Sequence, residues 1–207
     1  TRKKLVEPRT DAQKAYVKAL FENELAFGIG PAGTGKTYLA ICKAVEALQK
    51  GRVSKIVLSR PAVEAGEQIG FLPGGMEDKL APYLRPLYDA LSDRLSPGQL
   101  KHMLAEGVIE IAPIGFMRGR TLNNAFIVID EAQNCTYTQL KMLLTRLGWH
   151  STMVITGDPN QSDLLPEFSG LSKAAEKLEQ LSGASVIRLE AADVVRHPLV
   201  AEMLDVL

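Results

Sequence analysis

Eight consecutive residues combine glycine, lysine and threonine in the spacing of a phosphate-binding loop. The pattern G-x-x-x-x-G-K-[ST] is filled in order by Gly30, Pro31, Ala32, Gly33, Thr34, Gly35, Lys36 and Thr37. Glycines let the backbone curl so that successive N–H groups point at phosphate oxygens, and a helix starting near Gly35 adds its positive dipole end. Lys36 then reaches the β- and γ-phosphates, while the Thr37 hydroxyl ligates Mg²⁺. The segment therefore predicts a site for ATP with Mg²⁺, and we extend the predicted nucleotide-binding set to Tyr38.

Two adjacent carboxylates follow the most apolar short run of the chain. Asp130 and Glu131 come directly after Phe126–Ile129, at the strand end where open α/β sheets place ligands. A magnesium ion held by one hydroxyl and a nucleotide needs a further acidic contact, which Asp130 can supply. Glu131 can orient and deprotonate an attacking water, which favours hydrolysis over phosphate transfer by a small-molecule kinase. A solvated strand end is the alternative interpretation of this pair.

Two glutamines extend the predicted site. Gln161 follows the expected strand Met153–Thr156 in a polar stretch, where its amide can contact both the γ-phosphate and the attacking water. A plain turn is the alternative, since Gly, Asp, Pro and Asn all favour turns. Gln13 lies on an expected helix, Asp11–Phe21, and its amide can pair with N6 and N7 of adenine, which would select ATP over GTP. For Gln13, a surface glutamine is an equally good interpretation.

Hydrolysis also needs positive charge near the departing γ-phosphate, which an arginine finger can supply in cis or from a neighbouring subunit. The candidates are Arg60, Arg118, Arg120 and Arg196, each close to the end of an expected strand. Arg118 and Arg120 flank a glycine in a loop suited to reaching another subunit or a nucleic acid. Solvated surface arginines are the alternative for each of them.

The elements that must position these residues alternate between short β-rich runs and longer helical ones. Such alternation implies crossovers, a parallel sheet and a three-layer α/β fold. The expected strands are Leu25–Ile29, Lys55–Ser59, Val108–Ala112, Phe126–Ile129, Met153–Thr156 and Val186–Leu189. Beside Asp11–Phe21, the expected helices are Thr37–Leu48, Met76–Leu95, Pro97–Ala105, Thr138–Leu147 and Leu171–Leu181.

The segment Pro61–Pro113 is less regular because it is rich in proline and glycine. We expect it to form loops and helices outside the sheet, and excursions of this kind often carry function. No linker or repeat divides the remainder. Residues 1–207 are therefore expected to form one domain with this helical excursion.

Composition narrows the class of protein. Lysine plus arginine and aspartate plus glutamate both number 24, so the chain lacks the strongly positive field of many nucleic-acid binders. Cys42 and Cys135 have no metal-type spacing and do not suggest a disulfide framework. The sequence shows no membrane-length apolar run and no signal peptide, so we expect a cytoplasmic protein without membrane association.

Seven segments in their order resemble the PhoH family of bacterial phosphate-starvation-inducible ATPases. They are GPAGTGKT, SRPAVEAGEQIGFLPG, PYLRPLYDAL, IEIAPIGFMRGRTL, FIVIDEAQN, TGDPNQSDL and DVVRHPLV. The resemblance runs from about Asp11 to the C-terminus. It implies a RecA-like fold similar to the first motor domain of superfamily-1 helicases, with ATPase activity and work on RNA.

The resemblance also implies roles for individual residues. Gln13 corresponds to an adenine-reading glutamine, Gln161 to a γ-phosphate sensor and Arg196 to a late arginine that contacts the γ-phosphate. Lys36 with Thr37, and Asp130 with Glu131, correspond to the two nucleotide-binding motifs. Arg60 occupies a place where helicases touch the nucleic-acid strand.

Two functions remain open from the sequence. The chain matches only the first of a helicase's two motor domains, so a motor built from it is expected to take the partner surface from another copy, in a ring or another homo-oligomer. The first hypothesis is therefore an oligomeric ATPase that binds or remodels RNA. The second is an ATP-dependent protein-interaction switch without a nucleic-acid substrate, with Gln161 among its moving parts.

Overall fold

Parallel pairing of short apolar runs builds the centre of the protein. The computed structural model describes residues 7–62, 80–194 and 197–207. Within these residues, six strands form one sheet in the order β3-β2-β4-β5-β1-β6, and every neighbouring pair is parallel. The strands are β1 (Leu25–Ile29), β2 (Lys55–Arg60), β3 (Ile109–Pro113), β4 (Ala125–Ile129), β5 (Thr152–Gly157) and β6 (Ala184–Arg188). The predicted parallel sheet is confirmed, and β4 is buried at all of its positions, as its unbroken apolar run suggested.

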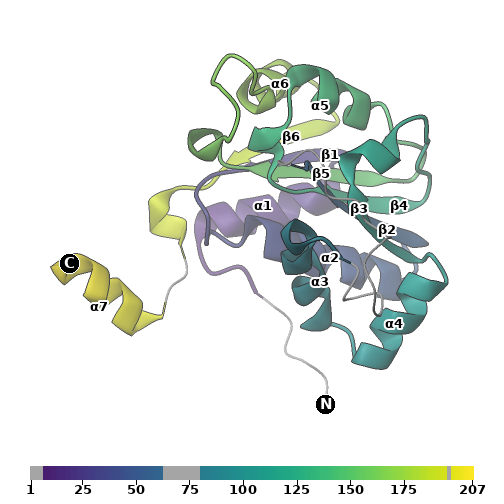
Figure 1. The fold of residues 1–207 in the computed structure, drawn as a ribbon, viewed down its shortest axis with the longest axis horizontal. Coiled ribbons are helices and arrows are strands. Elements are labelled where there is room, and N and C mark those ends of the chain that lie inside the picture. Colours follow the sequence, from purple (N-terminus) through teal and green to yellow (C-terminus); the bar gives the residue numbers. More distant parts are fainter. Residues whose placement is uncertain (1–6, 63–79, 195–196) are drawn as a thin grey trace.

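Helices cover both faces of the sheet, which makes three layers (Figure 1). One apolar cluster joins the sheet to α1 (Asp11–Glu22), α2 (Lys36–Gln49), α3 (Arg85–Ser92) and α4 (Pro97–Ala105). A second cluster joins the other face to α5 (Tyr137–Leu144) and α6 (Leu171–Leu178). The C-terminal helix α7 (Pro198–Val206) lies apart from these layers (Figure 1).

Strand order decides which loops meet. The chain passes from β1 to β2 and later returns to place β4 and β5 between them. Because all strands are parallel, the carboxyl ends of β1, β2, β4 and β5 lie at one edge of the sheet, with Ile29 level with Gly157 and Ser59 level with Ile129. Open α/β sheets bind ligands at this edge, next to the point where the strand order reverses.

Several predicted boundaries were wrong at helix ends. The helix predicted to reach Leu147 ends at Leu144, because the chain then turns so that Leu147 forms a β-bridge with Leu122. The helix predicted to reach Leu181 ends at Leu178, and Leu181 is exposed.

The predicted excursion 61–113 extends too far. Its last residues form β3, which pairs in register with β2 from Ile56 and Ile109 onward, so the excursion ends before Ile109. Of the predicted helix Met76–Leu95, residues 76–79 lie outside the described residues. The remainder begins with a 3-10 turn, Pro82–Leu84, and continues as α3. In the part of the chain that the structure describes, no helix is long and apolar enough to cross a membrane.

Candidate active site

The phosphate loop connects β1 to α2 and is held in a curled conformation. Gly33 and Gly35 both have φ of +83°, a left-handed conformation that favours glycine, and Gly35 is the N-cap of α2. Thr34 is fully buried, and its hydroxyl donates to the carbonyl of Pro31 at 2.9 Å. This contact closes the turn. The loop therefore presents its backbone at the amino end of a 14-residue helix.

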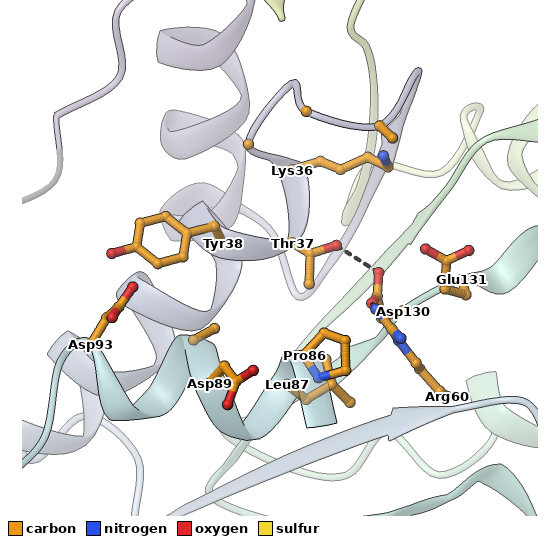
Figure 2. A pocket seen from close by; sticks show the side chains of 14 residues that line it. Lys36, Thr37, Tyr38, Arg60, Pro86, Leu87, Asp89, Asp93, Asp130 and Glu131 are labelled. Carbon is orange, nitrogen blue, oxygen red and sulfur yellow. Dashed lines mark hydrogen bonds and ion pairs between the residues drawn. The ribbon is translucent and has the colours of Figure 1, made fainter. Parts of the chain in front are cut away.

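Lys36 and Thr37 form the first turn of α2 and point toward the strand ends (Figure 2). The Lys36 ammonium donates to the carbonyl of Pro31 at 3.1 Å. Burial lowers the pKa of Lys36, and the carboxylates of Asp130, Glu131 and Asp158 oppose this shift. The backbone of Lys36 is also fixed, because the buried Tyr16 hydroxyl donates to its carbonyl at 2.6 Å. Tyr16 is thus a core residue that supports the helix start.

Asp130 is the centre of the polar network at the end of β4. Its Oδ1 accepts hydrogen bonds from the Thr37 hydroxyl at 2.6 Å and from the Thr156 hydroxyl at 2.8 Å (Figure 2). The two hydroxyls lie 3.1 Å apart. Mg²⁺ prefers oxygen ligands, so a hydroxyl and a carboxylate in contact have the right chemistry to hold it. The structure therefore brings together the two residues predicted to share the metal.

Arg60 completes this network from the end of β2. Its Nε and a terminal guanidinium nitrogen lie 2.7 and 2.6 Å from Oδ2 of Asp130, and Nη1 donates to the carbonyl of Tyr83 at 2.7 Å. Asp130 is only 2% exposed, and a buried carboxylate is costly unless it is paired. Arg60 therefore compensates the charge of Asp130 and ties it to the segment before α3.

Glu131 adopts a left-handed backbone conformation with φ of +54°. Its carboxylate accepts a hydrogen bond from the side-chain amide of Gln133 at 2.5 Å. It lines a cavity of about 480 Å³ at the sheet edge, together with residues of the phosphate loop, α2, α3 and two strand ends. The side chains or backbone that line the cavity belong to Ala32, Gly33, Gly35, Lys36, Thr37, Tyr38, Arg60, Pro86, Leu87, Asp89, Ala90, Asp93, Asp130 and Glu131.

Comparison with known proteins identifies the family. The model of the PhoH-like protein family matches residues 5–207. The chain belongs to the PhoH family. Its relatives include a PhoH-like protein of Bacillus subtilis, 55% identical over 203 residues, which cover 98% of this chain and 64% of that protein. A PhoH-like protein of Mycobacterium tuberculosis is 56% identical over 99% of this chain and 58% of its own length, and Protein PhoH of Escherichia coli is 44% identical over 92% and 55%.

This PhoH-family chain thus spans a little over half of the length of the relatives compared here. Among solved structures, it resembles a Sulfolobus solfataricus SWI2/SNF2 ATPase core in complex with dsDNA, with a TM-score of 0.53 and 17% identity over 90% of this chain and 47% of that one. It also resembles the large terminase of a thermophilic bacteriophage, with a TM-score of 0.56 and 10% identity over 96% and 50%. These similarities confirm the predicted RecA-like fold.

The two predicted glutamines lie beside the site rather than in the cavity lining. Gln13 is buried, and its Nε2 donates to the carbonyls of Thr34 at 2.9 Å and Asp193 at 3.2 Å. Its Oε1 accepts from the main chain at the start of α1. Gln161 is exposed at the end of a 3-10 turn, Pro159–Gln161, directly after β5.

The remaining predicted arginines are dispersed. Arg118 is exposed on the loop that follows β3. Arg120 forms a two-point ion pair with Glu110 of β3, at 2.9 and 2.8 Å, so the structure places it along the edge strand and away from the cavity lining. Arg196 lies outside the described residues.

Sequence reasoning missed two residues of the network, Thr156 and Gln133. Thr156 is fully buried at the end of β5, and its threonine type was hidden within an otherwise apolar strand. Gln133 stands two positions after Glu131, and it is buried to 2% exposure. A polar residue at the carboxyl end of a predicted central strand was the available signal for Thr156.

Proposed function

We propose that this PhoH-family chain binds ATP with Mg²⁺ and hydrolyses it to ADP and phosphate. The observation that carries the proposal is the 2.6 Å contact between the Thr37 hydroxyl and the Asp130 carboxylate at the switch point of the sheet. Lys36 and Glu131 line the same cavity. An ammonium, a hydroxyl and two carboxylates are the groups that a metal–triphosphate complex and an attacking water require.

Each residue has a distinct task in this reaction. The amides of the phosphate loop and the Lys36 ammonium bind the β- and γ-phosphates. Thr37 and Asp130 would hold Mg²⁺, which when bound neutralises charge on those phosphates. Glu131 accepts a proton from the attacking water as the new bond to phosphorus forms and the bond to the ADP oxygen breaks.

Further contacts are proposed for the residues around this centre. Gln161 would sense the γ-phosphate, which is supported by its position directly after β5. Gln13 would recognise adenine, which is supported by its contact with the phosphate loop, although its Nε2 must then exchange a carbonyl partner for the base. Arg60, Arg118 and Arg196 are the candidates for the arginine finger.

We also propose that ATP hydrolysis is coupled to RNA in a homo-oligomer. Support for RNA comes from the exposed aromatic Phe116 close in sequence to the exposed Arg118, because ring and guanidinium planes both stack on bases. Support for assembly comes from α7, where Leu199, Met203 and Leu204 are 55%, 44% and 52% exposed. Clustered exposed apolar groups of this kind mark interaction surfaces. A nucleotide switch that acts on a protein partner is the alternative.

One experiment tests both levels of the proposal. The rate of phosphate release from ATP is measured with Mg²⁺ or EDTA, with and without single-stranded RNA, alongside the mass in solution. We expect Mg²⁺-dependent turnover, stimulation by RNA and a mass above that of one chain. Lys36→Ala should abolish binding or turnover, and Glu131→Gln should bind ATP but hydrolyse it ~10²-fold more slowly or worse, as expected for a lost general base. Normal turnover by Glu131→Gln would remove its role, and turnover without RNA stimulation would favour the switch.

A further inference from the structure

Gln133 is a buried amide that contacts both sides of the candidate site. It lies on a 3-10 turn, Ala132–Asn134, and is 2% exposed. Its Nε2 donates to Oε2 of Glu131 at 2.5 Å, and its Oε1 accepts from the main-chain N–H of Asp158 at 3.1 Å. A single side chain therefore joins the carboxylate after β4 to the loop after β5.

The contact with Glu131 restricts a side chain that is otherwise free to rotate. Hydrogen bonds to a carboxylate are among the stronger ones in proteins, and a buried donor has few alternative positions. The backbone of Glu131 is itself in a left-handed conformation, which a non-glycine residue keeps only where its surroundings enforce it. Backbone and side chain are thus both fixed toward the cavity.

The contact with Asp158 fixes the other end of the amide. Asp158 starts the turn that carries Gln161: its carbonyl accepts from the Gln161 N–H at 3.0 Å, and its carboxylate accepts from the Asn160 N–H at 3.0 Å. The end of β5 approaches Gln133 so closely that a Cβ added at Gly157 would lie 2.7 Å from Oε1. The amide therefore sits in a space that β5 leaves for it.

The main chain of Gln133 is anchored independently of its side chain. Its carbonyl accepts hydrogen bonds from the hydroxyls of Ser162 at 2.8 Å and Ser169 at 3.0 Å. These two bonds hold the loop after β5 against the turn after β4. A loss of the side-chain amide would therefore leave the turn attached, which separates the role of the amide from the stability of the loop.

We propose that Gln133 is a positioning residue for ATP hydrolysis, which orients Glu131 toward the attacking water and fixes it relative to the turn of Gln161. The inference rests on the proposed hydrolysis. An amide has no proton that titrates in the working range, so Gln133 acts through Glu131 and takes no proton itself. It plays the part of the third group in a chain of reacting atom, base and orienting partner.

The test compares variants of Gln133 in the whole chain. Gln133→Met keeps a side chain of similar length and removes both hydrogen bonds, and Gln133→Asn keeps the amide but shortens its reach. We expect kcat for ATP to fall about 10- to 100-fold, as for other residues that orient a functional group, while KM and the Kd for Mg²⁺ with a non-hydrolysable ATP analogue change less than about twofold. Ser169→Ala is the matched control, because it removes a hydrogen bond to Gln133 without touching the amide, and its kcat should stay within about twofold of wild type.

A double variant separates positioning from general damage. In a Glu131→Gln background the oriented carboxylate is gone, so adding Gln133→Asn should lower kcat by less than about twofold, whereas independent effects would multiply. Multiplied losses, or unchanged kcat in folded Gln133→Met and Gln133→Asn, would overturn the role of Gln133. Absent Mg²⁺-dependent turnover in the wild-type chain would instead remove the proposed hydrolysis itself, and this is recognised before any variant is measured.

Discussion

Asp130 receives more polar contacts than a metal-binding carboxylate alone would need. Two hydroxyls contact its Oδ1, and the Arg60 guanidinium contacts its Oδ2. Since a buried charge is tolerated only when it is paired and hydrogen-bonded, these donors fix the carboxylate in one orientation. The position of the proposed metal ligand is therefore determined by residues from α2, β2 and β5 together.

Thr156 offers a selective test of this orientation. Thr156→Val keeps the shape of the side chain and removes the donor that lies 2.8 Å from Oδ1 of Asp130. A hydrogen bond to a charged group contributes about 1.5–3 kcal/mol, so we expect the Mg²⁺-dependent affinity for ATP to fall by about tenfold or more. Titration of a fluorescent ATP analogue at several Mg²⁺ concentrations measures this. Thr152→Val, at the opposite end of the same strand, is the control, and equal affinities for the two variants would contradict the expectation.

The residues that the sequence predicted well are those in contiguous motifs. The phosphate loop carries its own geometry, because glycine, lysine and threonine act within eight neighbouring positions. Asp130 and Glu131 were found because they follow an apolar strand. Thr156 and Gln133 were missed because their partners are 23 or more residues away, or belong to a turn whose shape no local pattern specifies.

At the scale of elements, strands were predictable and helix ends were not. All six strands were placed within about two residues, because buried parallel strands are short apolar runs between polar turns. Helix ends depend on where the chain turns to meet other segments, as Leu147 does when it leaves α5 to pair with Leu122. The helix α7 was not predicted, since its apolar residues have no periodic separation from polar ones.

The end of β5 must approach the turn after β4 closely, and Gly157 permits this. An added Cβ would lie 2.7 Å from both Oε1 of Gln133 and Cδ2 of Leu171, and 3.0 Å from the Gln133 main-chain nitrogen. We therefore expect Gly157→Ala to lower the free energy of unfolding by about 1–3 kcal/mol, the usual cost of overpacking, and to lower kcat through Gln133.

Denaturant unfolding and ATP turnover measure the two effects of Gly157→Ala. Gly98→Ala in α4 is a suitable control, because a Cβ there meets no atom within 4 Å and alanine favours helix more than glycine does. Wild-type stability and turnover in Gly157→Ala would show that β5 and the turn have room to separate, which would contradict the close packing described here.

At the scale of the whole molecule, the two edges of the sheet carry different surfaces. The chain has no net charge, so nucleic-acid binding must depend on local groups rather than on an overall field. Phe116 is 60% exposed on a 3-10 turn, Ile114–Met117, which follows β3 at the same edge as Arg60. Trp149 is 79% exposed but lies before β5, at the opposite edge. The two aromatics therefore form a natural pair for comparison.

The proposed coupling to RNA predicts that only the aromatic at the active-site edge matters. Phe116 is displayed outward because its neighbours Ile114 and Met117 are buried, so Phe116→Ala should leave the fold and the unstimulated ATPase rate intact. A stacked base contributes about 1–3 kcal/mol, so the RNA concentration for half-maximal stimulation should rise roughly 5- to 100-fold, while Trp149→Ala changes it little. Stimulation should also weaken as salt rises, because phosphate contacts release counterions. Equal RNA responses in wild type and Phe116→Ala would place the RNA elsewhere, whereas no response to RNA in any of the three proteins would favour a switch that acts on a protein partner.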